Sequence, residues 1–289
     1  MTACCLLLSA FCLYNPSVVN VEIVTIGNEV LLGLVQDTNS GYLCRVVRGT
    51  GGRVRHIAIV RDEIESIAEA VRASLARRAD LIFTCGGLGP TDDDLTLAGV
   101  AKATGRRLEL NKDAREFVER RYRELAEAGY VANARMSESR LKMAQLPEGS
   151  RPVDNPLGAA PAMAMEANLS RIVSLPGVPA ELKAIIEGPL QPLLNEVFGR
   201  GSYREREMTV ECGDESVLAH ALRQVAAALD DVYIKSRASH FGRDAVFRIS
   251  ISASASSPEE ADRLIESASE DLTRVFQDAG IDQAKEIKQ

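Results

Sequence analysis

The chain has 289 residues, of which 46% are hydrophobic and 26% are charged, and its formal net charge is -7. This composition is typical of a globular protein, so extended disorder is not expected. The acidic balance argues against a surface that neutralises nucleic-acid phosphates or anionic lipid, because both need clustered lysine and arginine. We therefore expect a small-molecule partner, with neither nucleic acid nor membrane.

Residues 1–19 differ from the rest of the chain. They contain an apolar run from Ala3 to Leu13 with no lysine or arginine ahead of it, and the run is too short to span a bilayer. We interpret this segment as a leader or a mis-assigned start outside the fold, the alternative being an extra strand or arm. Cys44, Cys85 and Cys212 show no metal-type spacing, so we expect reduced thiols and a cytoplasmic protein.

Strands and helices alternate in the first part of the chain. Apolar, β-branched runs predict strands at 21–26, 53–60 and 81–84. Apolar residues at helical spacing predict one helix capped by Asn39 and another that starts at Asp62. This alternation indicates parallel βαβ units, whose ligands bind at the carboxyl ends of the strands. Three residues follow such ends: Gly27, Asp62 and Gly86.

Further helices are predicted at 113–128 and 137–145, followed by strand-like stretches at 162–165 and 172–175. Two segments that contain proline and glycine stand beside these stretches, at 154–161 and 175–182. Because proline and glycine fix backbone geometry, we expect shaped loops there and not flexible linkers.

The pattern changes near Gly199. A βαββα order follows, with strands at 206–211, 232–235 and 244–253 and helices at 215–228 and 258–276. This order predicts a small α+β domain at 201–276 after a larger α/β domain at 20–200. The polar residues 277–289 are expected to form a frayed tail.

The strongest chemical signal is the segment Thr84-Cys85-Gly86-Gly87-Leu88-Gly89-Pro90-Thr91-Asp92-Asp93-Asp94-Leu95-Thr96, between a strand and the next helix. Three glycines let the backbone approach a ligand and turn its amides inward, and the helix N-terminus adds positive potential. The segment therefore predicts a phosphate cradle. A plain turn between strand and helix is the alternative when the glycines are considered alone.

Three consecutive carboxylates beside a phosphate cradle would repel an anionic ligand unless a cation compensates. A hard divalent metal that bridges carboxylate and phosphate is the usual solution, so we expect Mg²⁺, Mn²⁺ or Co²⁺ at Asp93 and Asp94. The alternative is that one of these aspartates caps the following helix. We interpret Asp92 as a solvated surface charge.

The segment resembles the signature loop of CinA (competence/damage-inducible protein A), a branch of the MoaB/Mog molybdopterin-binding superfamily. Supporting matches occur in order along the chain. Gly27-Asn28-Glu29-Val30-Leu31-Leu32-Gly33 with Thr38-Asn39 resembles the first loop of the family, and Asp62 stands where the superfamily carries a functional aspartate. Two late ligand loops resemble 155–161 and 176–181.

The resemblance implies a three-layer α/β sandwich of MoaB/Mog type with a smaller, KH-like α+β domain. It also implies that the first loop, Asp62, the glycine loop and both late loops converge on one pocket. There we expect catalytic roles for Asp94, Asp62 and Glu29. The expected phosphate or ligand contacts are Gly27, Asn39, Gly86, Gly87, Leu88, Gly89, Pro90, Thr91, Thr96, Asn155, Gly158, Pro176, Gly177 and Pro179.

For function, the resemblance implies a metal-dependent pyrophosphatase that acts on ADP-ribose or FAD-type dinucleotides. The alternatives are molybdopterin binding or adenylation, and nucleotide binding without catalysis. We also expect a homo-oligomer. The deamidase activity of full-length bacterial CinA is not expected, because its extra domain has no match here. RNA binding is not expected, because the KH-like part has no Gly-x-x-Gly loop.

Overall fold

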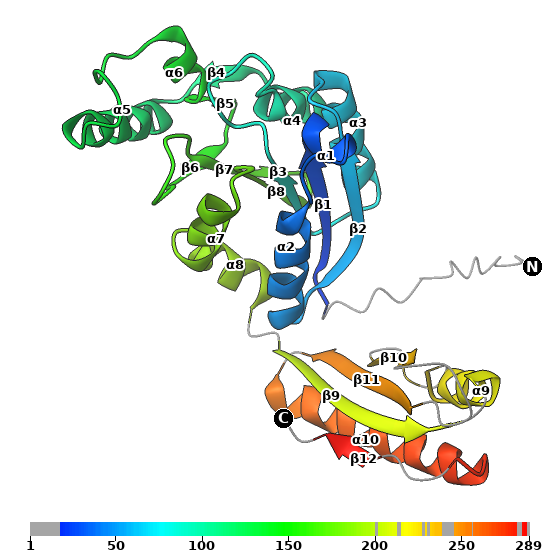
Figure 1. The fold of residues 1–289 in the computed structure, drawn as a ribbon. Coiled ribbons are helices and arrows are strands. Elements are labelled where there is room, and N and C mark those ends of the chain that lie inside the picture. The colour runs from blue at the N-terminus through cyan, green and yellow to red at the C-terminus, as the bar shows by residue number, and fades with distance from the viewer. Residues whose placement is uncertain are drawn as a thin grey trace, which may run out of the picture.

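The computed structural model describes residues 18–199, 202–212, 215–226, 229, 232–238, 246–255, 257–281 and 285–287. They build a larger unit around a six-stranded sheet and a smaller unit around a four-stranded sheet (Figure 1). In this part of the chain no helix is both long enough and apolar enough to cross a bilayer. The expected leader covers residues 1–19, of which 1–17 lie outside the described residues, whereas the carbonyl of Val19 accepts from the amide of Arg53 at the start of a strand of the larger unit.

The strands of the large sheet follow the order β2-β1-β3-β8-β7-β6. Four neighbours run parallel: β2 (Arg53–Val60), β1 (Asn20–Ile26), β3 (Leu81–Cys85) and β8 (Ser170–Leu175). Next to them β7 (Ala162–Ala167) is antiparallel to β8, and β6 (Arg151–Val153) is antiparallel to β7. The sheet is thus mixed, and its parallel part matches the predicted βαβ units.

Helices cover both faces of this sheet. One apolar core joins it to α2 (Thr38–Gly49), α7 (Pro179–Glu187) and α8 (Gln191–Phe198). The core on the other face joins it to α3 (Ile64–Ala76), α4 (Thr96–Thr104) and α5 (Lys112–Glu127). Alternate residues of a strand point to opposite faces, so β3 sends Leu81 and Phe83 into the first core and Ile82 into the second. The predicted three-layer α/β sandwich is confirmed.

Short elements complete the large unit. The one-turn helix α1 (Asn28–Leu31) follows β1, and α6 (Glu138–Lys142) follows α5. A separate two-stranded sheet pairs β4 (Leu108–Leu110) with β5 (Gln145–Pro147). These elements cover the upper end of the sheet in Figure 1, near the carboxyl ends of its parallel strands.

A tight turn between β7 and β8 decides where the late loops lie. Asn168 adopts a left-handed conformation with φ 57°, and Ala167 pairs directly with Ser170. Because the two strands are antiparallel, the start of β7 lies beside the end of β8. The loop before β7 and the loop after β8 therefore reach the same edge of the sheet, which is the edge of the glycine loop.

The small unit contains β9 (Ser202–Glu211), α9 (Glu215–Ala226), β10 (Val232–Ala238), β11 (Val246–Ala255), α10 (Pro258–Asp278) and β12 (Lys285–Ile287). Its sheet has the order β10-β11-β9-β12 with antiparallel pairs, and its apolar core is its own. The prediction of a frayed tail from residue 277 is wrong for two segments. The helix α10 continues to Asp278, and residues 285–287 pair with the edge of β9.

Candidate functional site

The glycine loop between β3 and α4 lies against two other loops. The amide of Gly86 donates to the carbonyl of Leu175 at 3.0 Å. A Cβ on Gly86 would overlap the carbonyl oxygen of Ile26, and one on Gly177 would lie 3.4 Å from the Cα of Gly86. The first loop, the glycine loop and the last loop are thus in contact, as the resemblance implies.

Asn39 joins the first loop to the last. Its side-chain amide donates to the carbonyl of Gly177 at 2.8 Å, and the residue is 9% exposed. The prediction that Asn39 caps α2 is wrong, because Asp37 occupies that position and accepts from the amide of Ser40 at 2.9 Å. The carboxylate of Asp37 also accepts from the hydroxyls of Thr25 and Ser40. The negative charge of Asp37 therefore stabilises the N-terminus of α2 and is satisfied by groups of the protein.

Thr96 fixes the shape of the glycine loop from the first turn of α4. Its hydroxyl donates to the carbonyl of Gly86 at 2.7 Å, and its amide donates to the carbonyl of Gly87 at 3.2 Å. Gly86 and Gly87 have φ values of 106° and 63°, which favour glycine. The polar groups of Gly86 and Thr96 are thus engaged within the protein, and both residues act on a ligand only through the loop that they shape.

The next three amides of the loop remain available. Among the described residues, the N–H groups of Gly87, Leu88 and Gly89 have no hydrogen-bond acceptor. Gly87 and Gly89 are partly exposed, whereas the side chain of Leu88 is buried and anchors the loop. Adjacent free amides in such a turn form a concave site for an anion. The loop is therefore partly accessible to solvent at Gly87 and Gly89, and the carboxylate of Asp94 lies against Gly89.

Thr91 holds the two predicted metal-binding aspartates together. Its amide donates to Asp94 Oδ2 at 2.8 Å, and its hydroxyl lies 2.5 Å from the same oxygen and 2.6 Å from Asp93 Oδ1. The hydrogen bond from Thr91 is the main reason why the pKa of Asp93 lies below its ordinary value. The alternative that an aspartate caps α4 is wrong, because Leu95 occupies the N-cap position and no side chain makes a capping hydrogen bond there.

Two more carboxylates lie near this pair. Asp62 precedes α3, which begins at Ile64 and not at Asp62, and its Oδ2 accepts from the amide of Asn28 at 2.6 Å. Burial is the largest cause that raises the pKa of Asp62, and the negative charges of Glu29 and Asp93 add to it. The Glu29 carboxylate lies over Gly27. This edge of the sheet is therefore acidic and favours a cation.

The donor set suits a magnesium-like ion only in part. Within the described ranges, no group of three or more His, Cys, Asp or Glu side chains is arranged to hold a metal. Mg²⁺ is often bound by one or two carboxylates together with substrate phosphates and water. Asp93 and Asp94, held side by side by Thr91, can supply those two carboxylates.

Asn155 shapes the first late loop from inside. It is 1% exposed, its amide donates to the carbonyl of Ala160 and to Glu181 Oε2, and its Oδ1 accepts from the amides of Leu157 and Gly158. Its hydrogen-bonding groups are thus engaged, so Asn155 positions the loop and offers nothing free to a ligand. In the second late loop Pro176 is buried, Gly177 is exposed, and Pro179 begins α7.

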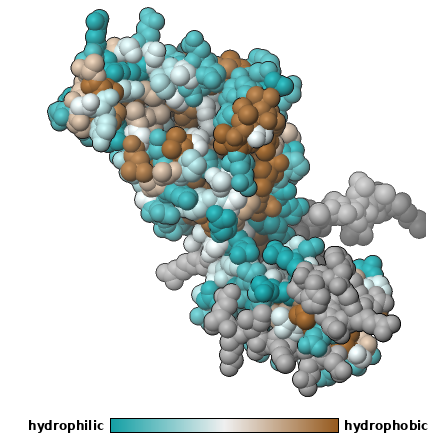
Figure 2. All heavy atoms as spheres, viewed as in Figure 1, coloured by the Kyte–Doolittle hydropathy of each residue, from teal (hydrophilic) through white to brown (hydrophobic). Residues whose placement is uncertain are grey.

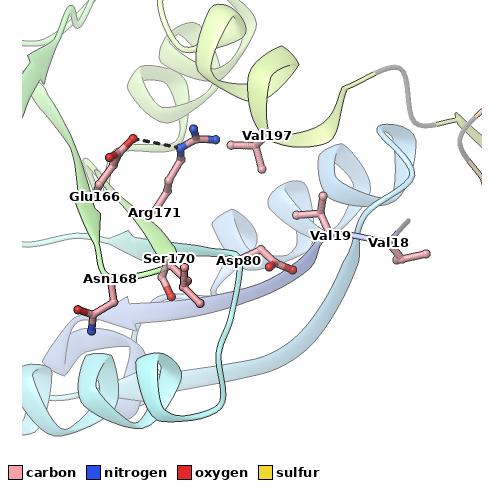
Figure 3. Close-up of a pocket in the computed structure, with 9 residues that line it drawn as sticks. Val18, Val19, Asp80, Glu166, Asn168, Ser170, Arg171 and Val197 are labelled. Atoms are coloured by element: carbon pink, nitrogen blue, oxygen red, sulfur yellow. Dashed lines mark ion pairs between the residues drawn. The ribbon is translucent and has the colours of Figure 1, made fainter. Parts of the chain in front are cut away.

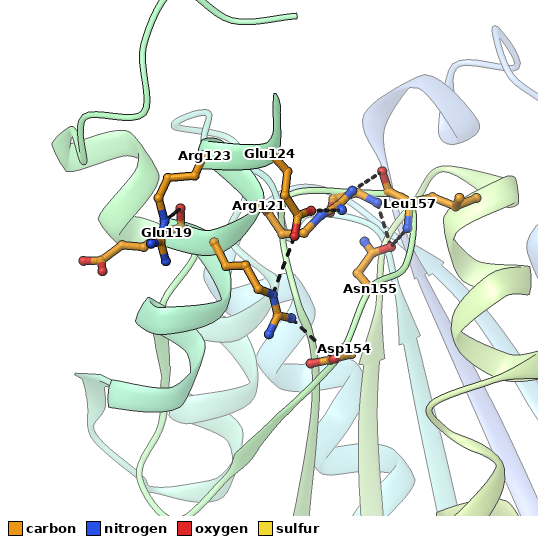
Figure 4. Close-up of polar contacts among 9 residues, drawn as sticks. Glu119, Arg121, Arg123, Glu124, Asp154, Asn155 and Leu157 are labelled. Carbon is orange, nitrogen blue, oxygen red and sulfur yellow. Dashed lines mark hydrogen bonds and ion pairs between the residues drawn. The ribbon is translucent and has the colours of Figure 1, made fainter. Parts of the chain in front are cut away.

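Two basic residues at the site were not predicted. Arg121 on α5 donates to the carbonyls of Gly158 at 2.9 Å and Leu157 at 3.1 Å, and it pairs with Glu124 (Figure 4). Lys142 on α6 donates to the carbonyl of Thr91. Neither residue belongs to a recognisable motif. Arg121 is one of many charged residues of α5, and α6 has only five residues. Only the fold brings these side chains to the loops.

An apolar rim borders the acidic side of the site. It consists of the exposed side chains of Leu31, Leu32, Leu34 and Val35 and forms the brown patch over α1 in Figure 2. The carbonyl of Glu29 accepts from the amides of Leu34 and Val35 and so holds this segment beside the carboxylates. The site thus combines free amides, carboxylates and an apolar wall.

A comparison with known protein families shows to which family this chain belongs. A model of the family "Probable molybdopterin binding domain" matches residues 22–196. This range exceeds half of the chain and includes each of the predicted site residues. The chain belongs to this family.

Similar proteins extend the family assignment. A relative from Pyrobaculum calidifontis is 38% identical over 255 residues, which are 88% of this chain and 94% of that protein. Another from Aeropyrum pernix is 41% identical over 241 residues, covering 83% and 87%. The crystal structure of CinA from Thermoplasma acidophilum, a protein of unknown function, is 32% identical with a TM-score of 0.56, covering 62% of this chain and 99% of that one. The chain is a CinA-like member of the MoaB/Mog-type family.

Proposed function

We propose that this protein binds a phosphorylated nucleotide on the glycine loop and hydrolyses the pyrophosphate of ADP-ribose or FAD-type dinucleotides with a divalent metal. One observation carries the proposal: Gly89, the last of three residues with free amides, lies against the carboxylate of Asp94, which Thr91 pairs with Asp93. The amides complement a phosphate oxygen, and carboxylates next to them are productive only when a cation is shared with the phosphate.

Different residues of the site would bind the phosphate, exclude water and accept a proton. The loop amides would bind and orient one phosphate, and the apolar rim at Leu31 to Val35 would exclude water from one side. Asp62, whose pKa is raised by burial, is suited to accept a proton from the attacking water. A metal bound to Asp93 and Asp94 would supply charge neutralisation when present.

The test compares neighbouring aspartates. AMP release from ADP-ribose is measured with and without Mg²⁺ or Mn²⁺ for the wild type, Asp94→Asn and the exposed control Asp92→Asn. We expect metal-dependent release that falls at least about 100-fold in Asp94→Asn. Asp92→Asn should stay within about threefold, because its carboxylate is solvent-exposed. Equal activity in the two variants would contradict the proposed roles.

A pterin ligand is the second candidate. The description of the matching family, a probable molybdopterin-binding domain, favours it. In that case molybdopterin, and not a dinucleotide, raises the melting temperature of the protein, since a ligand of the native state stabilises it. An ATP-dependent change in the bound pterin would indicate adenylation. Tight nucleotide binding without product under several metals would instead indicate a binding protein without catalysis.

A further inference from the structure

A second hollow lies between the large and the small unit. It is formed by the end of α2, the start of β2 and the outer face of the small sheet, and its volume is about 540 Å³. Cavities of a few hundred Å³ or more are the size that small ligands occupy. The polar and aromatic residues that line it are Arg48, Arg53, Tyr203, Tyr233, Ser252 and Ser254.

The strand register explains the shape of this cleft. On β11, alternate residues Phe247, Ile249 and Ile251 enter the core with α9 and α10, so Ser252 and Ser254 face the other way. Ser252 lies opposite Tyr233 on one side and Glu205 on the other, and Ser254 lies opposite Tyr203. The small side chains of Ser252 and Ser254 thus lie beside Tyr233 and Tyr203 on the face of the sheet that lines the cleft.

Tyr203 carries the most informative polar atom of the cleft. Its hydroxyl oxygen is buried and has no hydrogen-bond partner among the described residues. Burial raises the pKa of Tyr203, and Ser252 and Glu205 lie near enough to influence it without a hydrogen bond of normal geometry. A buried hydroxyl without a hydrogen bond of normal geometry is uncommon, so the Tyr203 side of the cleft is incompletely satisfied by Ser252 and Glu205.

The charged and aromatic side chains of the cleft favour a ligand that is both anionic and planar. The guanidinium of Arg48 lies 4.6 Å from the centre of the Tyr203 ring and pairs with Glu205 at 3.2 Å. Arg53 is exposed and makes no ion pair within the described part of the chain, so its charge is available. Tyr233 is 65% exposed and offers a free ring face. Stacking on a tyrosine is a usual way to hold a nucleobase.

We propose that this cleft binds a mononucleotide-sized ligand, with its planar ring on Tyr233 and its anionic group at Arg53. Tyr203 and Arg48, whose guanidinium lies over the Tyr203 ring, line the same cleft. The cleft is separate from the glycine loop. Asn39 lies at the start of α2 and Arg48 near its end, and an α-helix of this length spans about 15–18 Å. The proposal therefore does not depend on the proposed pyrophosphatase activity.

The test uses 8-azido-AMP as a photoaffinity probe on the full-length protein, with AMP as competitor and mass spectrometry to locate the labelled peptides. The variants are Tyr233→Ala and Arg53→Gln. The matched controls are Tyr130→Ala, at a tyrosine that is 80% exposed on the large unit, and Arg72→Gln, at an exposed arginine of α3. Melting curves of each variant confirm that it is folded.

We expect label on peptides that contain Tyr203 or Tyr233, removed by excess AMP. It should fall about fivefold or more in both cleft variants and stay within about twofold in the controls. Label confined to residues 84–96 would overturn the cleft proposal while supporting the proposed function. Label in the cleft without label on residues 84–96 would support the cleft proposal but not the proposed function of the glycine loop. Equal cleft labelling in Tyr233→Ala and wild type would overturn the assignment.

Discussion

The side chain of Asn39 donates a hydrogen bond to the backbone of Gly177, 138 residues further along the chain, at 2.8 Å. This bond connects the first and last loops of the candidate site directly. It also makes the geometry of the ligand loops depend on one amide at the start of α2.

Replacing Asn39 by alanine should therefore loosen the last loop. The carbonyl of Gly177 loses its donor, and we expect a loss of about 0.5–1.5 kcal/mol in the free energy of unfolding. Urea denaturation measures this change. Asn195→Ala, at an exposed asparagine of α8, is the control and should stay within about 0.5 kcal/mol. If both variants are equally stable, the bond contributes nothing.

Two glycines with positive φ should respond differently to alanine. At Gly86, φ is 106° and a Cβ would overlap the carbonyl oxygen of Ile26, whereas at Gly105, φ is 66° and a Cβ would meet no atom within 4 Å. We expect Gly105→Ala to cost about 1–2 kcal/mol from backbone strain alone. Gly86→Ala should cost more than about 3 kcal/mol or prevent folding, since strain and overlap add. Thermal unfolding of the two variants measures the difference, and similar melting temperatures would contradict this packing.

Arg121 should control the mobility of the first late loop. Arg121→Ala removes the donors to the carbonyls of Leu157 and Gly158, so the amides of 155–161 should exchange hydrogen faster and the protein should lose about 1–3 kcal/mol. Hydrogen–deuterium exchange read by mass spectrometry tests this. Arg115→Ala on the same helix breaks an exposed pair with Glu119 and should leave the loop unchanged. Faster exchange in both variants would point to α5 as a whole.

A partly buried ion pair should make the free energy of unfolding depend on pH in a defined way. Glu22 on β1 is nearly buried and accepts two hydrogen bonds from Arg77, at 2.7 and 2.6 Å. Burial alone would raise the pKa of Glu22, but the bonds from Arg77 and Ser74 outweigh it, so the pKa falls below its ordinary value of 4.5.

A carboxyl with a lowered pKa stabilises the fold above the pKa of the unfolded chain, and this contribution disappears as the pH falls through the folded value. Glu22→Gln should cost about 1–3 kcal/mol at pH 7, a range that allows for the partial exposure of Arg77. The difference from wild type should shrink as the pH falls below 4.5. Glu65→Gln, at an exposed pair with Lys102, is the control. A difference that does not change with pH would contradict the ion-pair explanation.

Local sequence pattern predicts much of this fold. The strands at 21–26, 53–60 and 81–84 match β1, β2 and β3 within a residue, because apolar, β-branched runs between turn residues favour strands both in the buried β1 and β3 and in the largely exposed β2. The glycine loop also lies where the sequence places it, since Gly86 and Gly87 have the positive φ that such a turn requires. The resemblance to CinA added the late loops, which periodicity alone would not connect to the site.

Long-range partners could not be predicted in the same way. Asp37 and Asn39 are both good helix caps, and which of them caps α2 depends on Gly177 competing for the amide of Asn39. Arg121 and Lys142 look like ordinary surface charges, and only the path of α5 and α6 brings them to carbonyls of the loops. The pairing of residues 285–287 with β9 likewise depends on an open sheet edge that a polar sequence does not reveal.

The turn at Asn168 and Leu169 has a practical consequence. It lies at the opposite edge of the large sheet from the ligand loops, beside a hollow lined by Val19, Asp80 and Arg171 (Figure 3). Leu169 is 90% exposed. A cysteine introduced at this position could carry a fluorophore, or tether the molecule to a sensor chip, with the glycine loop directed into solution.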